Sequence, residues 1–195
     1  MVNAALCLWA SFPCIRISGL VRFRQMSTMA NTRIPRAMFF AILLAGFAQC
    51  VHDFPLLPDR LASHFGASGM PNGWMTKTQF FITYALVLLP ALFIEFWLHH
   101  KVSKTPEGNL NLPNKGYWLA PERRAETFAY FESFFAWYGC AFLFVIASVM
   151  GLAMRANFDT PPQLPTTPIV SILSGFAIFN VGAVIAMLRR FSLPT

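Results

Sequence analysis

Charged residues are scarce in this sequence: Lys, Arg, Asp and Glu make up 12% of its 195 residues. An average soluble domain has roughly 25%. Hydrophobic residues make up 56% of the chain. A folded protein with so few charges cannot cover its surface with groups that water solvates, so lipid must replace water over much of it. This composition excludes an ordinary water-soluble domain and predicts an integral membrane protein.

The sequence also lacks the spacings that bind metals. Its cysteines form no CxxC pair, and no histidine follows them at zinc-ligand spacing; they are Cys7, Cys14, Cys50 and Cys140. His99 and His100 are adjacent and would diverge on a helix, whereas metal ligands must converge. We therefore expect no metal site and no cofactor.

Acidic residues are few, so the formal net charge is +7. A nucleic-acid-binding protein gathers such charge on one face. Here the basic residues flank apolar runs instead. We expect them to contact the anionic headgroups of a lipid bilayer rather than nucleic acid.

Apolar runs cover residues 37–53, 79–98, 131–154 and 168–188. A helix needs about 20 apolar residues to cross a hydrocarbon core of about 30 Å. The first run is short, but its flanks, including Ile34 and Pro35, can lengthen it. The sequence predicts an all-α integral membrane bundle of four transmembrane helices over residues 34–195, with an ordered extracytoplasmic loop.

The distribution of Lys and Arg predicts the orientation. Twelve of the 15 lie in the N-terminal tail, in the loop after the second run and in the C-terminal tail; the other three are Arg60, Lys77 and Arg155. The positive-inside rule then places both termini in the cytoplasm and the segments 52–78 and 155–167 outside. We interpret the chain as a multi-pass protein of a bacterial cytoplasmic (inner) membrane.

Residues 1–33 form an N-terminal tail with two open interpretations. Its apolar stretch precedes its first arginine, Arg16, whereas a signal peptide has the charge first. Translation could start at Met1, Met26 or Met29. In the first interpretation the tail is an over-called start or a disordered segment. In the second it forms a short amphipathic helix on the inner leaflet of the membrane.

The expected outer segment, residues 57–77, holds the candidate ligand-binding residues: Asp59, Arg60, His64, Asn72, Trp74 and Lys77. A short helix from Pro58 would place Asp59 and Ser63 on one face. The glycine-rich stretch 66–73 must then turn. The segment is either a binding or sensing element centred on His64, or a cap whose polar groups satisfy one another. Ser63 and His64 point apart and no nucleophile elbow is present, so we expect no catalytic residues and no enzyme.

The same segment resembles the signature of an uncharacterised bacterial membrane domain that also forms the N-terminal part of SdpI-type immunity proteins. The matching residues are Leu57, Pro58, His64, Phe65, Gly66, Gly69, Pro71, Asn72, Gly73, Trp74, Thr76 and Lys77. Asn72 stands where the family more commonly has Asp. The later stretch 110–127 also resembles bacterial members. SdpI-type proteins protect a cell from a secreted killing peptide and relay the presence of that peptide to a repressor. The resemblance implies such a role for this chain, although SdpI-type proteins are longer.

Glu95 and Glu132 lie within apolar runs, where ionisable groups are costly and often functional. Glu95 forms either an interfacial pair with His99 or Lys101, or, with Glu132, a proton or cation site.

Packing features complete the prediction. Pro121 should open a helix that runs into the third span, after an interfacial anchor at Tyr117 and Trp118. Pro90 should kink the second span, and the small residues of the last span predict close helix packing; these are Ser171, Ser174, Gly175 and Gly182.

The sequence therefore favours a non-enzymatic membrane protein that binds or senses through residues 57–77, with a peptide ligand or another membrane protein as partner. The sharpest form of this prediction is an SdpI-like immunity role or an envelope stress role. The alternative is a small transporter, or an accessory subunit of a membrane complex, that uses Glu95 and Glu132.

Overall fold

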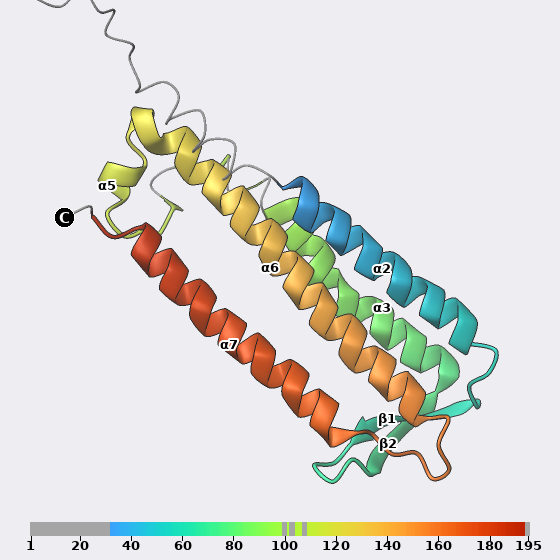
Figure 1. Ribbon diagram of the computed structural model, residues 1–195. Helices are drawn as coiled ribbons and strands as arrows, with labels where there is room; N and C mark the ends of the chain where they lie inside the picture. The colour runs from blue at the N-terminus through green and yellow to red at the C-terminus, as the bar shows by residue number, and fades with distance from the viewer. Residues whose placement is uncertain (1–31, 99–100, 102–103, 107–108, 194–195) are drawn as a thin grey trace, which may run out of the picture.

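The computed structural model describes residues 32–98, 101, 104–106 and 109–193 (Figure 1). The tail before residue 32, with its alternative starts, and His99 and His100 lie outside these residues. The elements are α2 (Arg33–Asp53), β1 (Arg60–Phe65), β2 (Pro71–Thr76), α3 (Lys77–Phe93), the π-helix η1 (Ile94–Leu98), α5 (Lys115–Trp118), α6 (Pro121–Ala156) and α7 (Thr166–Arg190).

Four helical segments of the described chain are long and apolar enough to cross a membrane. They are α2, α3 continued by η1, α6 and α7. The prediction of four such helices is confirmed, and each of the four apolar runs lies inside one of them. The chain therefore has the build of a multi-pass membrane protein that contacts a lipid bilayer.

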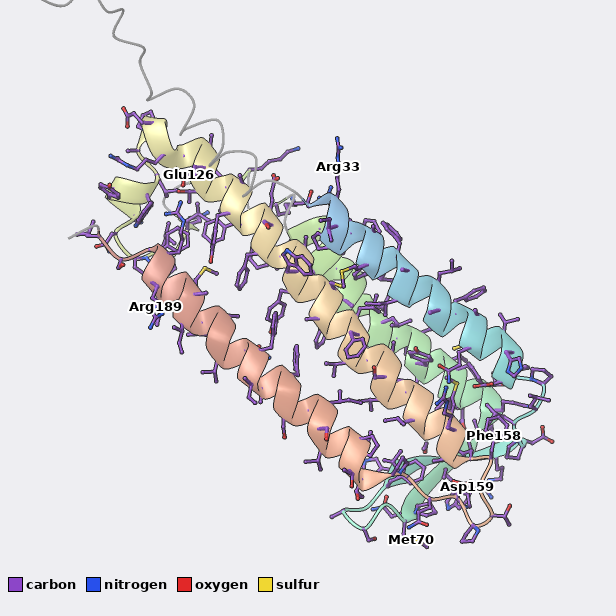
Figure 2. The ribbon with its side chains drawn as sticks, viewed as in Figure 1. Arg33, Met70, Glu126, Phe158, Asp159 and Arg189 are labelled. Carbon is purple, nitrogen blue, oxygen red and sulfur yellow. The ribbon has the colours of Figure 1, made fainter. Side chains whose placement is uncertain are left out.

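The long helix α6 is the centre of the bundle. The helices α2 and α3 both pack against it, and α7 runs along its other side (Figure 1). Arg33, Glu126 and Arg189 lie toward one end of the bundle, which we name the α5 end, and Met70, Phe158 and Asp159 lie at the other, the hairpin end (Figure 2). An even number of crossings thus brings both ends of the described chain to the α5 end.

The main apolar core lies between α2, α3, α6 and the hairpin. Its buried members are Phe39, Leu57, Leu61, Phe80, Tyr84, Ala91, Leu143, Ile146 and Met154. Glycine permits close approach within this core: a Cβ added at Gly151 of α6 would lie 3.0 Å from Oε1 of Gln49 on α2. Small residues at helix contacts are typical of membrane bundles.

A second cluster closes the α5 end around Phe191, which follows α7 and is fully buried. The indole of Trp118 and the amide of Asn114 both donate hydrogen bonds to the Phe191 carbonyl, each at 3.0 Å. Arg190 lies over the Trp118 ring at 4.5 Å and pairs with Glu126 at 2.7 Å. The expected anchor residue Trp118 thus fastens the C-terminal end of α7 to α5.

The two prolines have different consequences. Pro121 begins α6 as expected, since the first helical position needs no N–H donor. Pro90 lies inside α3, and the helix continues beyond Phe93 as the π-helix η1. A π-helical turn widens the backbone locally and changes the direction of the side chains that follow.

The bundle is not all-α, and the helix expected from Pro58 is wrong. Residues 60–65 form β1, which pairs with β2 in an antiparallel hairpin. Sequence spacing pointed to a helix because Asp59 and Ser63 lie four apart. The hairpin prevails because tertiary contacts, described below, satisfy the backbone of β1.

The close packing expected of the last span is also wrong within this chain. A Cβ added at Gly175 or Gly182 would meet nothing within 4 Å. The contact of α7 with α6 depends on a hydrogen bond of 2.8 Å from the Tyr138 hydroxyl to Oδ1 of Asn180, and on rings such as Phe176, 6.0 Å from Phe142.

Candidate functional site

The hairpin at the end of the bundle contains most of the candidate residues. Its register pairs Arg60 with Thr76 and Ala62 with Trp74, and a bulge at Ser63 shifts the pairing of His64 onto Gly73. The turn closes through Gly69, whose φ of +79° is a left-handed conformation that glycine adopts without strain. The glycines expected to turn in this segment therefore do so between two strands.

Glycine at position 73 allows the strands to meet. A Cβ there would lie 2.8 Å from the Cβ of His64, closer than real side chains approach. The imidazole Nδ1 of His64 lies 3.0 Å from Oδ1 of Asn72, a hydrogen bond in which the ring nitrogen donates. His64 and Asn72 therefore form one exposed unit across the hairpin.

Asn157, buried at the C-terminal end of α6, holds β1 against the bundle. The backbone N–H of Ala62 donates to its Oδ1 at 2.7 Å, and its Nδ2 donates to the Ala62 carbonyl at 3.0 Å and to the Ala153 carbonyl at 2.8 Å. One side chain thus supplies the hydrogen bonds that a third strand would otherwise give to β1.

The tip of the hairpin is fixed separately. The N–H of Leu164 donates to the carbonyl of Gly69 at 2.9 Å. A Cβ on Gly69 would lie 2.3 Å from the Leu164 carbonyl oxygen, so glycine is required there for space as well as for its backbone angle. Hairpin and the loop before α7 therefore form one folded unit.

Lys77 points inward rather than toward a ligand. Its Nζ donates to the carbonyls of Leu57 at 2.8 Å and Phe54 at 3.2 Å, and lies 5.0 Å from the centre of the Phe54 ring. Asp59 is 3.9 Å away but fully exposed, so that pair contributes little. Lys77 stabilises the chain reversal after α2.

The other five candidates are exposed: Asp59, Arg60, His64, Asn72 and Trp74. We name His64, Asn72 and Trp74 the hairpin face. Trp74 has 47% of its surface exposed, although it is the largest side chain of the hairpin. The structure thus brings His64 and Asn72 into contact and separates Lys77 from them.

An apolar groove lies elsewhere, along the membrane-crossing part of the bundle. This groove of about 690 Å³ runs between α2, α3 and α6, and its lining includes Phe40, Leu44, Phe47, Leu88 and Leu143. A specific ligand site usually adds several converging polar groups to an apolar lining. The groove is almost wholly apolar, which suits hydrocarbon chains.

Glu95 is 2% exposed and lies in η1. Its Oε1 is 3.4 Å from Nε of Arg36 on α2. Of the two partners expected for Glu95, Lys101 lies over the Trp97 ring at 5.3 Å instead, and His99 lies outside the described residues. Glu132 is half-buried on α6, seven residues before Gly139, the α6 residue that Glu95 faces.

No group of three or more His, Cys, Asp or Glu residues that could hold a metal ion occurs in the described part of the chain. The sequence did not identify Asn157 as the partner of β1 or Arg36 as the partner of Glu95. The available signal for the role of Asn157 was its position just after a long apolar helix. The available signal for the role of Arg36 was its position one turn into the first span.

Fold and site together define a helical, multi-pass membrane protein with a β-hairpin at one end of the bundle. Within it, residues 40–94 match the protein family described as a domain of unknown function (DUF1648). The matched region runs from α2 through the hairpin to the start of η1. No curated protein and no solved structure matches the chain.

Proposed function

We propose that this protein is a non-enzymatic component of a bacterial cytoplasmic membrane that binds or senses a ligand through the hairpin face, on the outer side. The observation that carries the proposal is the exposure of His64, Asn72 and Trp74 on a hairpin held from behind. A side chain as large and apolar as Trp74 stays exposed at a cost unless it meets a partner or the membrane interface.

The anchoring of the hairpin supports recognition rather than simple covering. Asn157 holds β1 and Leu164 holds the tip, while Lys77, directly after β2, bonds the Leu57 carbonyl in the segment that leads into β1. A surface fixed before binding loses little conformational entropy when a ligand arrives, which favours affinity. A cap that only satisfied its own polar groups would not need to expose its histidine, its amide and its indole together.

The resemblance to SdpI-type immunity proteins supplies the sharpest form of the proposal, tolerance of a secreted killing peptide. An exposed indole beside hydrogen-bonding groups suits an amphipathic peptide. A peptide-sensitive bacterium expressing the chain would be grown beside a strain that secretes the killing peptide of SdpI-type systems, and survival counted. Protection is expected from the natural chain, and its loss from His64→Ala and Trp74→Ala.

The matched control is Leu56→Ala. Leu56 is 60% exposed at the same end of the bundle and lies outside the hairpin, so its loss should leave protection intact. Immunoblots of membrane fractions would verify equal amounts of each variant. No protection by the natural chain, or full protection by the Trp74→Ala variant, would contradict the immunity role.

The orientation is part of the same proposal. Twelve of the 15 basic residues lie in the segments we place inside the cell, and both described ends of the chain lie toward the α5 end of the bundle (Figure 1). A periplasmic-active reporter fused after Leu193 should stay inactive, and the same reporter inserted after Ser68 in the hairpin turn should be active. The reverse result would move the hairpin face to the cytoplasm.

A further inference from the structure

Glu95 combines deep burial with an unused hydrogen-bonding atom. The buried polar or charged side chains among the described residues are Asp53, Glu95, Thr127 and Asn157. Among these four side chains, only Glu95 has a buried oxygen atom without a hydrogen-bond partner, and that atom is Oε2. A buried carboxylate oxygen without a donor is costly in a low-dielectric interior, so this position needs an explanation.

The local backbone sets Glu95 apart from an ordinary helical residue. It lies in the π-helix η1, which follows the proline-containing helix α3. Short π-helical turns inside α-helices occur frequently at functional sites, because they redirect a side chain at some cost in backbone stability. Here the turn directs Glu95 between α2 and α6.

The two carboxylate oxygens face different neighbours. Oε1 lies toward Arg36 of α2, whereas Oε2 faces Gly139 of α6, where an added Cβ would lie 3.4 Å away. Glycine therefore keeps a small space beside the free oxygen. The Cγ2 methyl of Ile94 also lies 3.4 Å from that added Cβ, so an apolar side chain borders the same space.

We propose that Glu95 is a proton-binding site inside the bundle. A hydronium ion from the aqueous phase gives its proton to Oε2: one of its O–H bonds breaks, water is released, a new O–H bond forms on the carboxyl, and the charge of the side chain changes from −1 to zero. The free oxygen then becomes a hydroxyl donor, and the ionic attraction to Arg36 is lost. This inference is independent of the hairpin face.

A proton fits the geometry better than a metal cation. Metal ions such as Ca²⁺ or Mg²⁺ need several converging oxygen ligands, and in the described residues one carboxylate oxygen points into this space. The titratable groups that face Glu95 in that part of the chain are Arg36 from α2 and Cys140 from α6. Proton uptake would therefore loosen the α5 end of α2, where Arg36 lies.

The test uses the full chain in lipid nanodiscs. Infrared difference spectra between about pH 4 and about pH 9 bracket the ordinary titration range of carboxyl groups. The natural chain should show the carbonyl stretch of a protonated acid in apolar surroundings, and Glu95→Gln should lack it. Glu126→Gln is the matched control, because Glu126 is a carboxylate paired with arginine but exposed; its spectrum should keep the band. Identical spectra for the natural chain and Glu95→Gln would overturn the proposal.

A second variant covers the case in which Glu95→Gln fails to insert. Gly139→Ala brings a methyl group against Oε2 and should shift the band without removing it. An unchanged band would overturn the assignment to Glu95. Loss of the band on adding sodium chloride at constant pH would assign the space to a metal cation and refute proton binding.

Discussion

Replacing Asn157 with alanine should release β1 from α6. The substitution removes the two hydrogen bonds that join the Asn157 amide to the N–H and carbonyl of Ala62. With a net value of about 1 kcal/mol each, the loss is about 2 kcal/mol. Since about 1.4 kcal/mol corresponds to a factor of ten, the Ala62 amide should exchange its hydrogen about thirtyfold faster.

Hydrogen–deuterium exchange of peptides covering residues 60–65 would measure this in nanodiscs. Asn180→Ala is the matched control, because Asn180 also bonds two groups, the Tyr138 hydroxyl and the Phe176 carbonyl, but in the middle of the bundle. It should leave exchange in the hairpin unchanged. If Asn157→Ala also left that exchange unchanged, the hairpin would be held by other contacts and the reasoning would be refuted.

Three further substitutions test single contacts through thermal unfolding in detergent. Lys77→Met loses two hydrogen bonds to carbonyls and should destabilise the protein by about 2 kcal/mol. Gly73→Ala forces a methyl group against His64 and should cost about 1 to 3 kcal/mol. Tyr138→Phe loses its bond to Asn180 and should cost only about 0.6 kcal/mol.

Controls for this series come from the same chain. Gly116→Ala adds a methyl group that meets nothing within 4 Å, so it should not lower the unfolding temperature. Lys77→Arg retains a cation and should recover part of the stability lost in Lys77→Met. A Gly73→Ala variant as stable as the natural chain would show that the strands can separate without cost.

The spans were predictable from the sequence because a bilayer imposes a simple requirement. A crossing segment must be apolar over about 20 residues, and the run 168–188 meets that requirement without reference to any neighbour. Pro121 was equally readable, since proline at the first helical position is a local preference. These features depend on a few adjacent residues and on the solvent.

The hairpin was not predictable from local spacing. The N–H of Ala62 is satisfied by Asn157, 95 residues away, and that partner cannot be read from residues 57–77. The same holds for the ion-pair partner of Glu95. Sequence proximity suggested Lys101, but the partner is Arg36, which lies on another helix. The inward use of Lys77 was missed for a related reason: its acceptors are backbone carbonyls, which every residue has.

The location of the candidate residues themselves was partly predictable. His64 and Trp74 were singled out as polar or amphipathic residues in a turn-rich segment, and both are exposed. Their role as ligand contacts stays a prediction. The four spans were predicted correctly, but the close packing expected of α7 was not found, because Gly175 and Gly182 face open space. Composition does not state which partner a helix face will meet.

The continuity of α6 limits how this protein can sit in a bilayer. Its 36 residues correspond to about 54 Å of helix axis at 1.5 Å per residue. Even at a tilt of about 40°, the steep end of the usual range, it would rise about 41 Å along the membrane normal, which exceeds a hydrocarbon thickness of about 30 Å. At least about 11 Å must therefore stand clear of the acyl chains, and the charged turns around Arg123, Arg124 and Glu126 are the part suited to water.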